Sequence, residues 1–295
     1  MKSSGLDRRS FVGGSLGVGA YLLSGCGSNS TESAAPAATA PARQRLDLGK
    51  PADFLTAIIK MRGSTVPKLS MGFVIGSYYG IVDDQATPLF GVLAGTFSLY
   101  EQLDNATYRA RALEVAYFTD IDTGQLLETW DNPYTGETVS VPQTRMGPST
   151  TLVRAEGLEI LRASGEAVGM ELNHRFRPAV TVGDQVWVTE EIKAVAAIPG
   201  RKPFVYNEMS TYHSNRDDLE DPNQASVRAN VEFHSIISWR PWMQMGGRPG
   251  HLTGRGSGQH VKAYAELPPL YQTLNAEHHP DVAENALALL TADDA

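Results

Sequence analysis

Four long segments in the second half of the chain alternate between apolar and polar residues, and this alternation constrains the fold more than any other feature. Side chains spaced two apart lie on the same face of a β-strand. The segments exceed the usual strand length, and no helical crossover separates them, as a parallel sheet would require. They predict consecutive antiparallel strands in a calycin-like or lipocalin-like β-barrel. The four segments are Val168–Arg177, Asp184–Ile198, Pro203–His213 and Ala225–Trp239.

The remaining sequence fits one mainly β domain, from residue 48 to residue 295, with short helices near its two ends. Apolar residues at helical spacing predict an N-terminal helix over Pro51–Met61. Runs of β-branched and aromatic residues between turn signals predict further strands. These strands are expected at Gly72–Val82, Thr87–Leu99 and Thr107–Thr119, and C-terminal helices at Pro269–Glu277 and Pro280–Leu290.

The N-terminus is typical of an export signal. Residues 7–12, with the pair Arg8-Arg9, resemble a twin-arginine signal, and the apolar run that follows is too short to span a membrane. Leu23-Ser24-Gly25-Cys26 then resembles a lipobox, so we expect a signal peptide over residues 1–25 and acylation of Cys26. The alternatives are a degenerate Sec signal, or a short anchor with an incidental cysteine.

Acylation of Cys26 would determine location and limit the chemistry. Cys26 is the only cysteine, so no thiol would remain for catalysis or a disulfide. Residues 26–47 are rich in Ser, Thr, Ala and Pro and predict a disordered tether. The domain is expected on the periplasmic side of the envelope, touching the membrane only through its lipid anchor, and Gly27 favours the outer membrane. A net charge of −8 without a basic cluster argues against nucleic acid as a partner.

Three ionisable residues occupy strand faces that are otherwise apolar. His174 alternates with apolar residues, Glu190 does so in the next strand, and Glu208 lies on an aromatic face. Buried charged groups need partners, and acid–base chemistry uses such partnered groups. We therefore predict catalytic roles for His174, Glu190 and Glu208 inside the barrel. The alternative is that each lies at a strand end or bulge, or forms one structural ion pair with an arginine such as Arg145 or Arg154.

Aromatic residues gather around the turn after residue 130 and at the end of the last long segment. Residues 239–246 hold two tryptophans, two methionines and a proline. This apolar run either plugs the barrel or forms the wall of a pocket for an aromatic or apolar molecule. The predicted ligand-binding residues are Trp130, Tyr134, Tyr206, Trp239 and Trp242.

Other short motifs carry less chemistry. The glycine-rich run Gly254–Gly258 is interpreted as a flexible loop, because it opens no helix. Asp120, Asp122 and Gly124 suggest a β-turn rather than a calcium loop. The common zinc-protease, serine-hydrolase and nucleotide-hydrolase signatures are absent from the sequence, and we expect neither a metal nor an organic cofactor.

Three motifs in order carry a family resemblance: Asp120 to Gly124, Trp130 to Glu137, with Asn-Pro-Tyr-Thr-Gly at its centre, and Trp239 to Gly246, with Pro-Trp-Met. Together they resemble the bacterial family called domain of unknown function 1838, over about residues 48–280. Val141–Met146 departs from the pattern, because a histidine-containing run is expected there. Members often carry twin-arginine signals. The resemblance implies a shared fold and no particular reaction.

Two classes of function fit these features. The first is a lipid-anchored binding protein that holds a small apolar or aromatic molecule in its barrel. The second is a lyase, isomerase or hydrolase without a cofactor that uses His174, Glu190 or Glu208 as acid and base. A structural lipoprotein is a third possibility.

Overall fold

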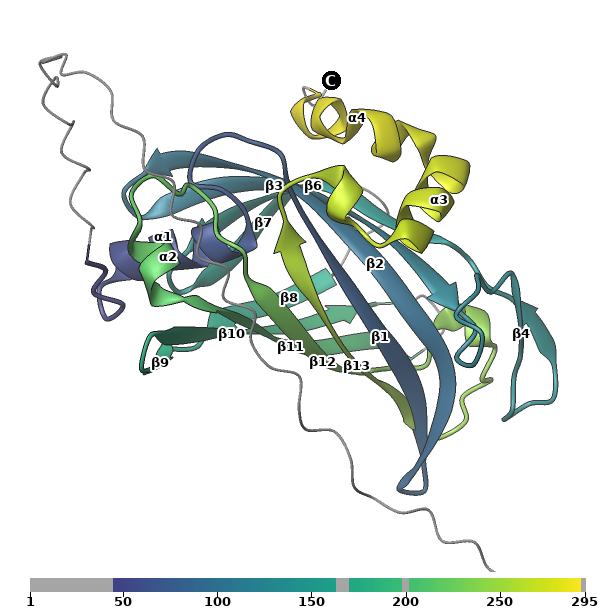
Figure 1. Ribbon diagram of the computed structural model, residues 1–295. Coiled ribbons are helices and arrows are strands. Elements are labelled where there is room, and N and C mark those ends of the chain that lie inside the picture. Colours follow the sequence, from purple (N-terminus) through teal and green to yellow (C-terminus); the bar gives the residue numbers. More distant parts are fainter. Residues whose placement is uncertain (1–44, 163–169, 198–201, 293–295) are drawn as a thin grey trace, which may run out of the picture. The chain divides into compact units, whose positions relative to one another are not determined.

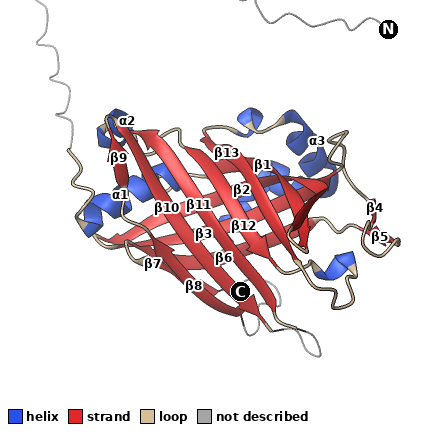
Figure 2. Ribbon diagram, turned by 90° about the horizontal axis from the view of Figure 1, so that it is seen from below, coloured by secondary structure: helices blue, strands red, loops and turns tan. Residues whose placement is uncertain are grey.

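A curled antiparallel sheet dominates the computed structural model, which describes residues 45–162, 170–197 and 202–292. Its strands follow the order β7-β6-β3-β2-β1-β13-β12-β11-β10-β8, with β9 paired to β10. Figure 2 looks through one wall of this nearly closed barrel, formed by β10, β11 and β12, onto β2 and β3 behind it. The predicted mainly β barrel with short terminal helices is confirmed. The strands are β1 (Ser70–Val82), β2 (Gln85–Asp104), β3 (Thr107–Thr119), β6 (Thr144–Arg154), β7 (Gly157–Arg162), β8 (Met170–Phe176), β9 (Val180–Val182), β10 (Gln185–Ala196), β11 (Phe204–Asn215), β12 (Asn230–Ile237) and β13 (His251–Val261).

Short helices and one hairpin complete the fold (Figure 1). The helices are α1 (Pro51–Arg62), α2 (Arg216–Glu220), α3 (Pro269–His278) and α4 (Pro280–Thr291), with the 3-10 turns η1 (Pro241–Met243) and η2 (Tyr264–Glu266). The hairpin pairs β4 (Thr129–Asp131) with β5 (Thr138–Ser140). Residues 1–44 lie outside the described part of the chain, and with them Arg8, Arg9, Cys26 and most of the predicted tether.

The prediction of a flexible loop at Gly254–Gly258 is wrong, because these residues lie inside β13. This strand pairs with β1 on one side and β12 on the other. Glycine is needed there because aromatic rings lie against the strand. A Cβ atom on Gly254 would lie 2.4 Å from Cε1 of Tyr78, and one on Gly256 would lie 2.6 Å from Cε1 of Phe233. Glycine in this strand therefore marks close approach rather than flexibility.

Both faces of β2 and β3 are buried, each against a different part of the molecule. Odd-numbered residues such as Leu113, Val115 and Tyr117 lie on the outer face, beneath α3 and α4 (Figure 1). Tyr271 of α3 reaches down to Gly95, where an added Cβ would lie 2.3 Å from its ring. The even-numbered residues of these strands face the barrel interior.

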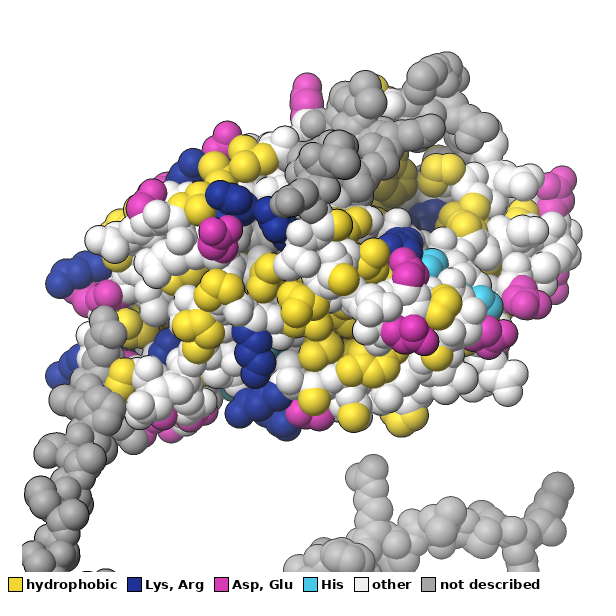
Figure 3. Space-filling view, turned by 90° about the horizontal axis from the view of Figure 1, so that it is seen from above, with side chains coloured by type: hydrophobic (Ala, Val, Ile, Leu, Met, Phe, Trp, Pro, Cys, Tyr) yellow, Lys and Arg dark blue, Asp and Glu magenta, His cyan; other side chains and the backbone are white. Residues whose placement is uncertain are grey.

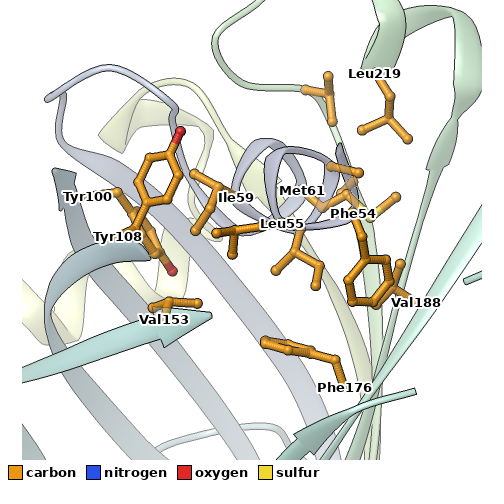
Figure 4. Close-up of a cluster of buried hydrophobic side chains, with 14 of the residues drawn as sticks. Phe54, Leu55, Ile59, Met61, Tyr100, Tyr108, Val153, Phe176, Val188 and Leu219 are labelled. Carbon is orange, nitrogen blue, oxygen red and sulfur yellow. The ribbon is translucent and has the colours of Figure 1, made fainter. Parts of the chain in front are cut away.

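Helix α1 closes one end of the interior (Figure 4). Pro51 suits its first turn, and Asp53 near its start and Arg62 at its end match the helix dipole. Its buried face, which includes Leu55 and Ile59, packs against inward side chains from strands all round the barrel. These include Tyr100, Tyr108, Val153, Phe176 and Val188. We call this helix the α1 plug.

A second apolar cluster closes the other end, and we call it the tryptophan plug. It joins the β4–β5 hairpin to η1 and includes Trp130 and Trp242. Asn132 is fully buried, and its Nδ2 donates to the backbone oxygen of Met243 at 2.8 Å. The Asn-Pro-Tyr-Thr-Gly and Pro-Trp-Met motifs, about 110 positions apart in the sequence, are therefore held together by this side chain.

Candidate functional site

The three predicted acid–base residues all face the barrel interior but belong to two separate groups. Ile192 of β10 lies opposite His174 on one side and opposite Glu208 on the other. Directly opposed residues share a face of the sheet. His174 nevertheless turns toward the neighbouring Glu190, whereas Glu208 contacts partners on its own strand.

His174 and Glu190, whose side chains are both buried, belong to one hydrogen-bonded group. Nδ1 of His174 accepts from the backbone N–H of Leu158 at 3.0 Å, so the ring proton lies on Nε2, which donates to Oε1 of Glu190 at 2.5 Å. Nη1 of Arg62, at the end of α1, donates to the same oxygen at 2.7 Å. The Tyr212 hydroxyl also hydrogen-bonds to Glu190. This group joins β7, β8, β10, β11 and the α1 plug.

Electrostatics favours a structural role for this group. Burial opposes ionisation of Glu190, but the charge of Arg62 and the hydrogen bonds of His174 and Tyr212 outweigh it, so the pKa of Glu190 is lowered. Glu190 is thus held as an anion with its partners already in place. Since β7 and β8 form the open edges of the sheet, His174 fastens the seam of the barrel. The alternative partners considered from the sequence are engaged elsewhere, Arg145 with Asp281 and Arg154 with Glu159.

Glu208 lies in a second polar group near the tryptophan plug. Its carboxylate accepts from the Tyr206 hydroxyl, and from Oγ of Ser210 at 3.0 Å. Directly across the sheet from Glu208 stands Ser235, then Gly254, then Tyr78. The Tyr78 hydroxyl accepts from Nη2 of Arg240 at 3.2 Å.

Glu114 of β3 belongs to this group and was missed in the sequence. Burial raises the pKa of its carboxyl group to about 7, with a further increase from Glu208 and a smaller opposing effect of Arg240. Its strand offered the same signal as the other three residues, because Glu114 lies between Ala112 and Ala116 on one face. The opposite face of that strand is also apolar, which obscured the signal. We call Tyr78, Glu114, Tyr206, Glu208, Ser235 and Arg240 the interior site.

Burial also raises the pKa values of the second acid and of two phenols in the interior site. Burial raises the pKa of Glu208, although the hydrogen bonds from Tyr206 and Ser210 oppose this. Burial and the nearby Glu208 raise the pKa of Tyr206 well above its usual value. Two carboxyl groups with raised pKa values therefore share one environment, an arrangement typical of functional sites.

Buried donors without partners surround the interior site. Among the described residues, Oγ of Ser235, Nε of Arg240 and Nε1 of both Trp239 and Trp242 are buried and make no hydrogen bond. The Tyr134 hydroxyl is in the same state. Most buried polar groups in proteins are paired, so each of these atoms calls for an explanation.

The five predicted ligand-binding aromatics lie in one cluster. Trp130, Tyr134, Tyr206, Trp239 and Trp242 all pack in the tryptophan plug or against it. The ring centroids of Trp130 and Trp242 are 5.8 Å apart, and those of Tyr134 and Trp239 are 5.3 Å apart. The sequence therefore located this cluster, while both a plug and a pocket wall remain compatible with it.

The middle of the barrel interior, between the two plugs, is accessible to solvent. Thr96 faces inward beside Glu114 and yet is exposed. Val74, Glu114 and Glu208, which also face inward, keep part of their surface exposed. An inward-facing side chain stays exposed only where solvent reaches it, so the interior site borders open space.

A separate groove of about 480 Å³ lies on the outer face of the sheet, across β1 and β10 to β13. Trp187 and His213 stack in parallel beside it, with ring centroids 4.6 Å apart. None of the predicted site residues lines this groove. On the face of the molecule that Figure 3 shows, acidic and basic side chains are interspersed and form no large patch of one charge.

Asp120 forms the predicted turn, with its Oδ1 accepting from the backbone N–H groups of Asp122 and Thr123. Within residues 45–162, 170–197 and 202–292, no three His, Cys, Asp or Glu side chains are placed to hold a metal ion. No helix in the same ranges is long and apolar enough to cross a membrane.

Comparison with known proteins identifies the family. A comparison with curated proteins gives no match. One family model, described as "Protein of unknown function (DUF1838)", matches residues 73–294, which is well over half of the chain. The resemblance carried by the Asn-Pro-Tyr-Thr-Gly and Pro-Trp-Met motifs is thus confirmed, although the matched range begins and ends later than expected. The chain belongs to the DUF1838 family of proteins of unknown function.

Proposed function

We propose that the barrel binds a small molecule between its two plugs. The polar part of the ligand contacts the interior site, and its apolar part lies against Trp242 and the neighbouring rings. One observation carries the proposal: buried donors on Ser235, Arg240 and Trp242 lack partners beside a solvent-accessible interior. A barrel fold is compatible with such a binding function.

The energetic cost of these donors supports a ligand. Leaving a buried donor without an acceptor costs about 1–3 kcal/mol, and more for a charged group. In the His174–Glu190 group, by contrast, both ring nitrogens of His174 and the carboxylate of Glu190 have partners. Unpaired hydrogen-bond donors beside the solvent-accessible barrel interior therefore favour a bound molecule as their partner.

Fluorescence titration of the full chain with N-phenylnaphthylamine tests the proposal. We expect saturable binding with one site, weakened at least about tenfold by Thr96→Phe, which fills the interior. Thr211→Phe is the matched control, because Thr211 lines the outer groove. Loss of binding in Thr211→Phe alone would move the site to the groove and contradict the proposal.

A second candidate function is acid–base catalysis by Glu114 and Glu208. The observation that favours it is the pKa of about 7 for Glu114, because a group that titrates near neutral pH can both accept and donate a proton. The test is mass spectrometry of a metabolite extract incubated with the protein. We expect Glu114→Gln and Glu208→Gln to slow any turnover at least about a hundredfold. Turnover at the wild-type rate in both variants would remove this candidate.

We further propose that the chain is exported by the twin-arginine route and anchored through acylated Cys26. The order of arginine pair, apolar run and lipobox supports this proposal. Intact-mass spectrometry of protein from the membrane fraction should show a chain that begins at an acylated Cys26. Cys26→Ser should abolish the acyl mass. An unprocessed N-terminus in the wild-type protein would contradict the proposal.

A further inference from the structure

We propose that the ligand of the interior site is an aromatic or apolar carboxylate, whose acid group binds Arg240. This inference rests on the proposed binding function and adds the chemical class of the ligand. Its basis is the set of contacts that Arg240 makes and the unpaired hydrogen-bond donors near it.

Arg240 is an interior cation without an ion-pair partner among the described residues. Its guanidinium lies over the faces of Phe118 and Tyr78, 4.9 Å and 5.2 Å from the ring centroids. Nη2 donates to the Tyr78 hydroxyl, whereas Nε is buried and free. Arg62, by contrast, forms an ion pair with Glu190, with 2.7 Å between Nη1 and Oε1. A guanidinium that is held between rings and has an unpaired N–H group is suited to binding a planar carboxylate.

The unpaired groups around Arg240 have one character in common, because they can all donate hydrogen bonds. Ser235 offers a hydroxyl, and Trp242, which packs on Phe118 as Arg240 does, offers an indole N–H group. Indole and guanidinium groups have no acceptor, so a ligand rich in donors would leave them unsatisfied. A carboxylate has only acceptors and can receive several of these bonds.

The protonation state of Glu114 decides how well the interior site accepts an anion. Glu114 is faced by Glu208 and Tyr206 from β11, by Arg240 after β12 and by Tyr78 from β1. Burial keeps the pKa of Glu114 near 7 and raises that of Glu208. Below about pH 7 Glu114 is protonated and no longer opposes the charge of Arg240, which favours a bound carboxylate. Above it the Glu114 carboxylate competes with the ligand, so affinity should fall as pH rises.

The aromatic surroundings define the rest of the ligand. Phe118 lies 5.5 Å from Trp242 and 5.2 Å from Phe90, measured between ring centroids. Rings at these separations offer edges and faces to a further aromatic group. A flat apolar body beside Trp242 would therefore place its acid group toward Arg240.

Calorimetric titration of the full chain with naphthoate and naphthamide tests this inference. The two probes share their rings and differ in charge. At about pH 6 we expect naphthoate to bind at least about tenfold more tightly, with a smaller ratio at about pH 8. Arg240→Gln should bring the ratio near one. Arg255→Gln is the matched control, because this exposed arginine lies on the outer face of β13 and should leave the ratio unchanged.

The outcomes separate the two proposals. Equal or tighter binding of naphthamide overturns the carboxylate inference and leaves the binding function standing. The same conclusion follows if neither probe binds while N-phenylnaphthylamine still does. If all three probes fail, the binding function itself is contradicted. Arg240→Lys keeps the charge and should retain part of the preference for naphthoate over naphthamide. If Arg240→Gln does not fold, the pH dependence of this preference in the wild-type protein still tests the inference.

Discussion

At the scale of single residues, two glutamates on inward faces show how partners decide a role. Glu190 and Glu114 both interrupt apolar strand faces, and Glu190 is the more deeply buried of the two. Arg62, His174 and Tyr212 surround Glu190 and keep it ionised. Glu114 has no such set of partners, and burial keeps its pKa near 7. The first glutamate is suited to holding the barrel together and the second to exchanging protons or meeting a ligand.

Removal of Arg62 should show the structural role of the first glutamate. Arg62→Met leaves Glu190, whose side chain is only 2% exposed, without its cation. Because an unpaired buried charge is costly, we expect the free energy of unfolding to fall by about 3–5 kcal/mol in urea titrations.

Arg154→Met is the matched control for this change. The ion pair of Arg154 with Glu159 is largely exposed, so its loss should change the free energy of unfolding by less than about 1 kcal/mol. Equal effects of the two substitutions would show that burial of the Glu190 group does not matter to stability.

The second glutamate should make stability depend on pH. Its carboxyl group has a pKa of about 7 in the folded protein, against the ordinary value of 4.5. Between these values the folded state keeps a proton that the unfolded chain releases, so stability falls as pH rises. Glu114→Gln should remove this loss. The variant should gain about 1–3 kcal/mol over the wild type between about pH 5 and pH 8.

Thermal melts across that pH range measure the effect. Glu137→Gln serves as the control, because Glu137 is exposed in the β4–β5 turn and should give no such trend. A constant difference between Glu114→Gln and the wild type at every pH would contradict the raised pKa.

At the scale of elements, the motifs that identify the family build the tryptophan plug. Asn132 links its own hairpin turn to η1, with Oδ1 accepting from the backbone N–H of Tyr134 and Nδ2 donating to Met243. Asn132→Ala would leave the Met243 carbonyl unpaired in a buried position. We expect a loss of about 1–3 kcal/mol in the free energy of unfolding and an altered tryptophan emission spectrum.

Asn173→Ala is the matched control for the Asn132 change. Asn173 is exposed on the outer face of β8, so its substitution should leave both readouts close to the wild type. An unaltered spectrum in Asn132→Ala would mean that the hairpin stays docked without this side chain.

The limits of the sequence at this scale have physical causes. Thr107–Thr119 was predicted with its observed bounds, because β-branched and aromatic residues occur on both of its faces. β13 was missed because its three alternate glycines lack the side chains that reveal a strand. Gly254 and Gly256 are needed beside the rings of Tyr78 and Phe233, and Gly258 beside the backbone of Phe73, all of which other strands supply.

The candidate site shows the same division. Period-two alternation located His174, Glu190 and Glu208 on inward faces, and composition located the aromatic cluster. Neither could show that His174 turns toward Glu190 while Glu208 contacts Tyr206, because that depends on pairings between strands. The part played by Arg240 was equally hidden, since it follows a strand end and has no alternation to disturb.

At the scale of the whole described unit, a barrel with two plugs leaves a middle that neither plug fills. Arg62 joins the α1 plug to the seam, and Asn132 holds the two parts of the tryptophan plug together. The acids of the interior site stand between the two plugs. This division between closed ends and an open centre is the basis of the proposed binding function.

The most direct test of that function is a crystal structure of the full chain with naphthoate bound. We predict density for the ligand inside the barrel, with its carboxylate on Arg240 and its rings beside Trp242. Ligand bound instead in the outer groove beside Trp187, with the interior filled by protein side chains, would contradict an interior binding site.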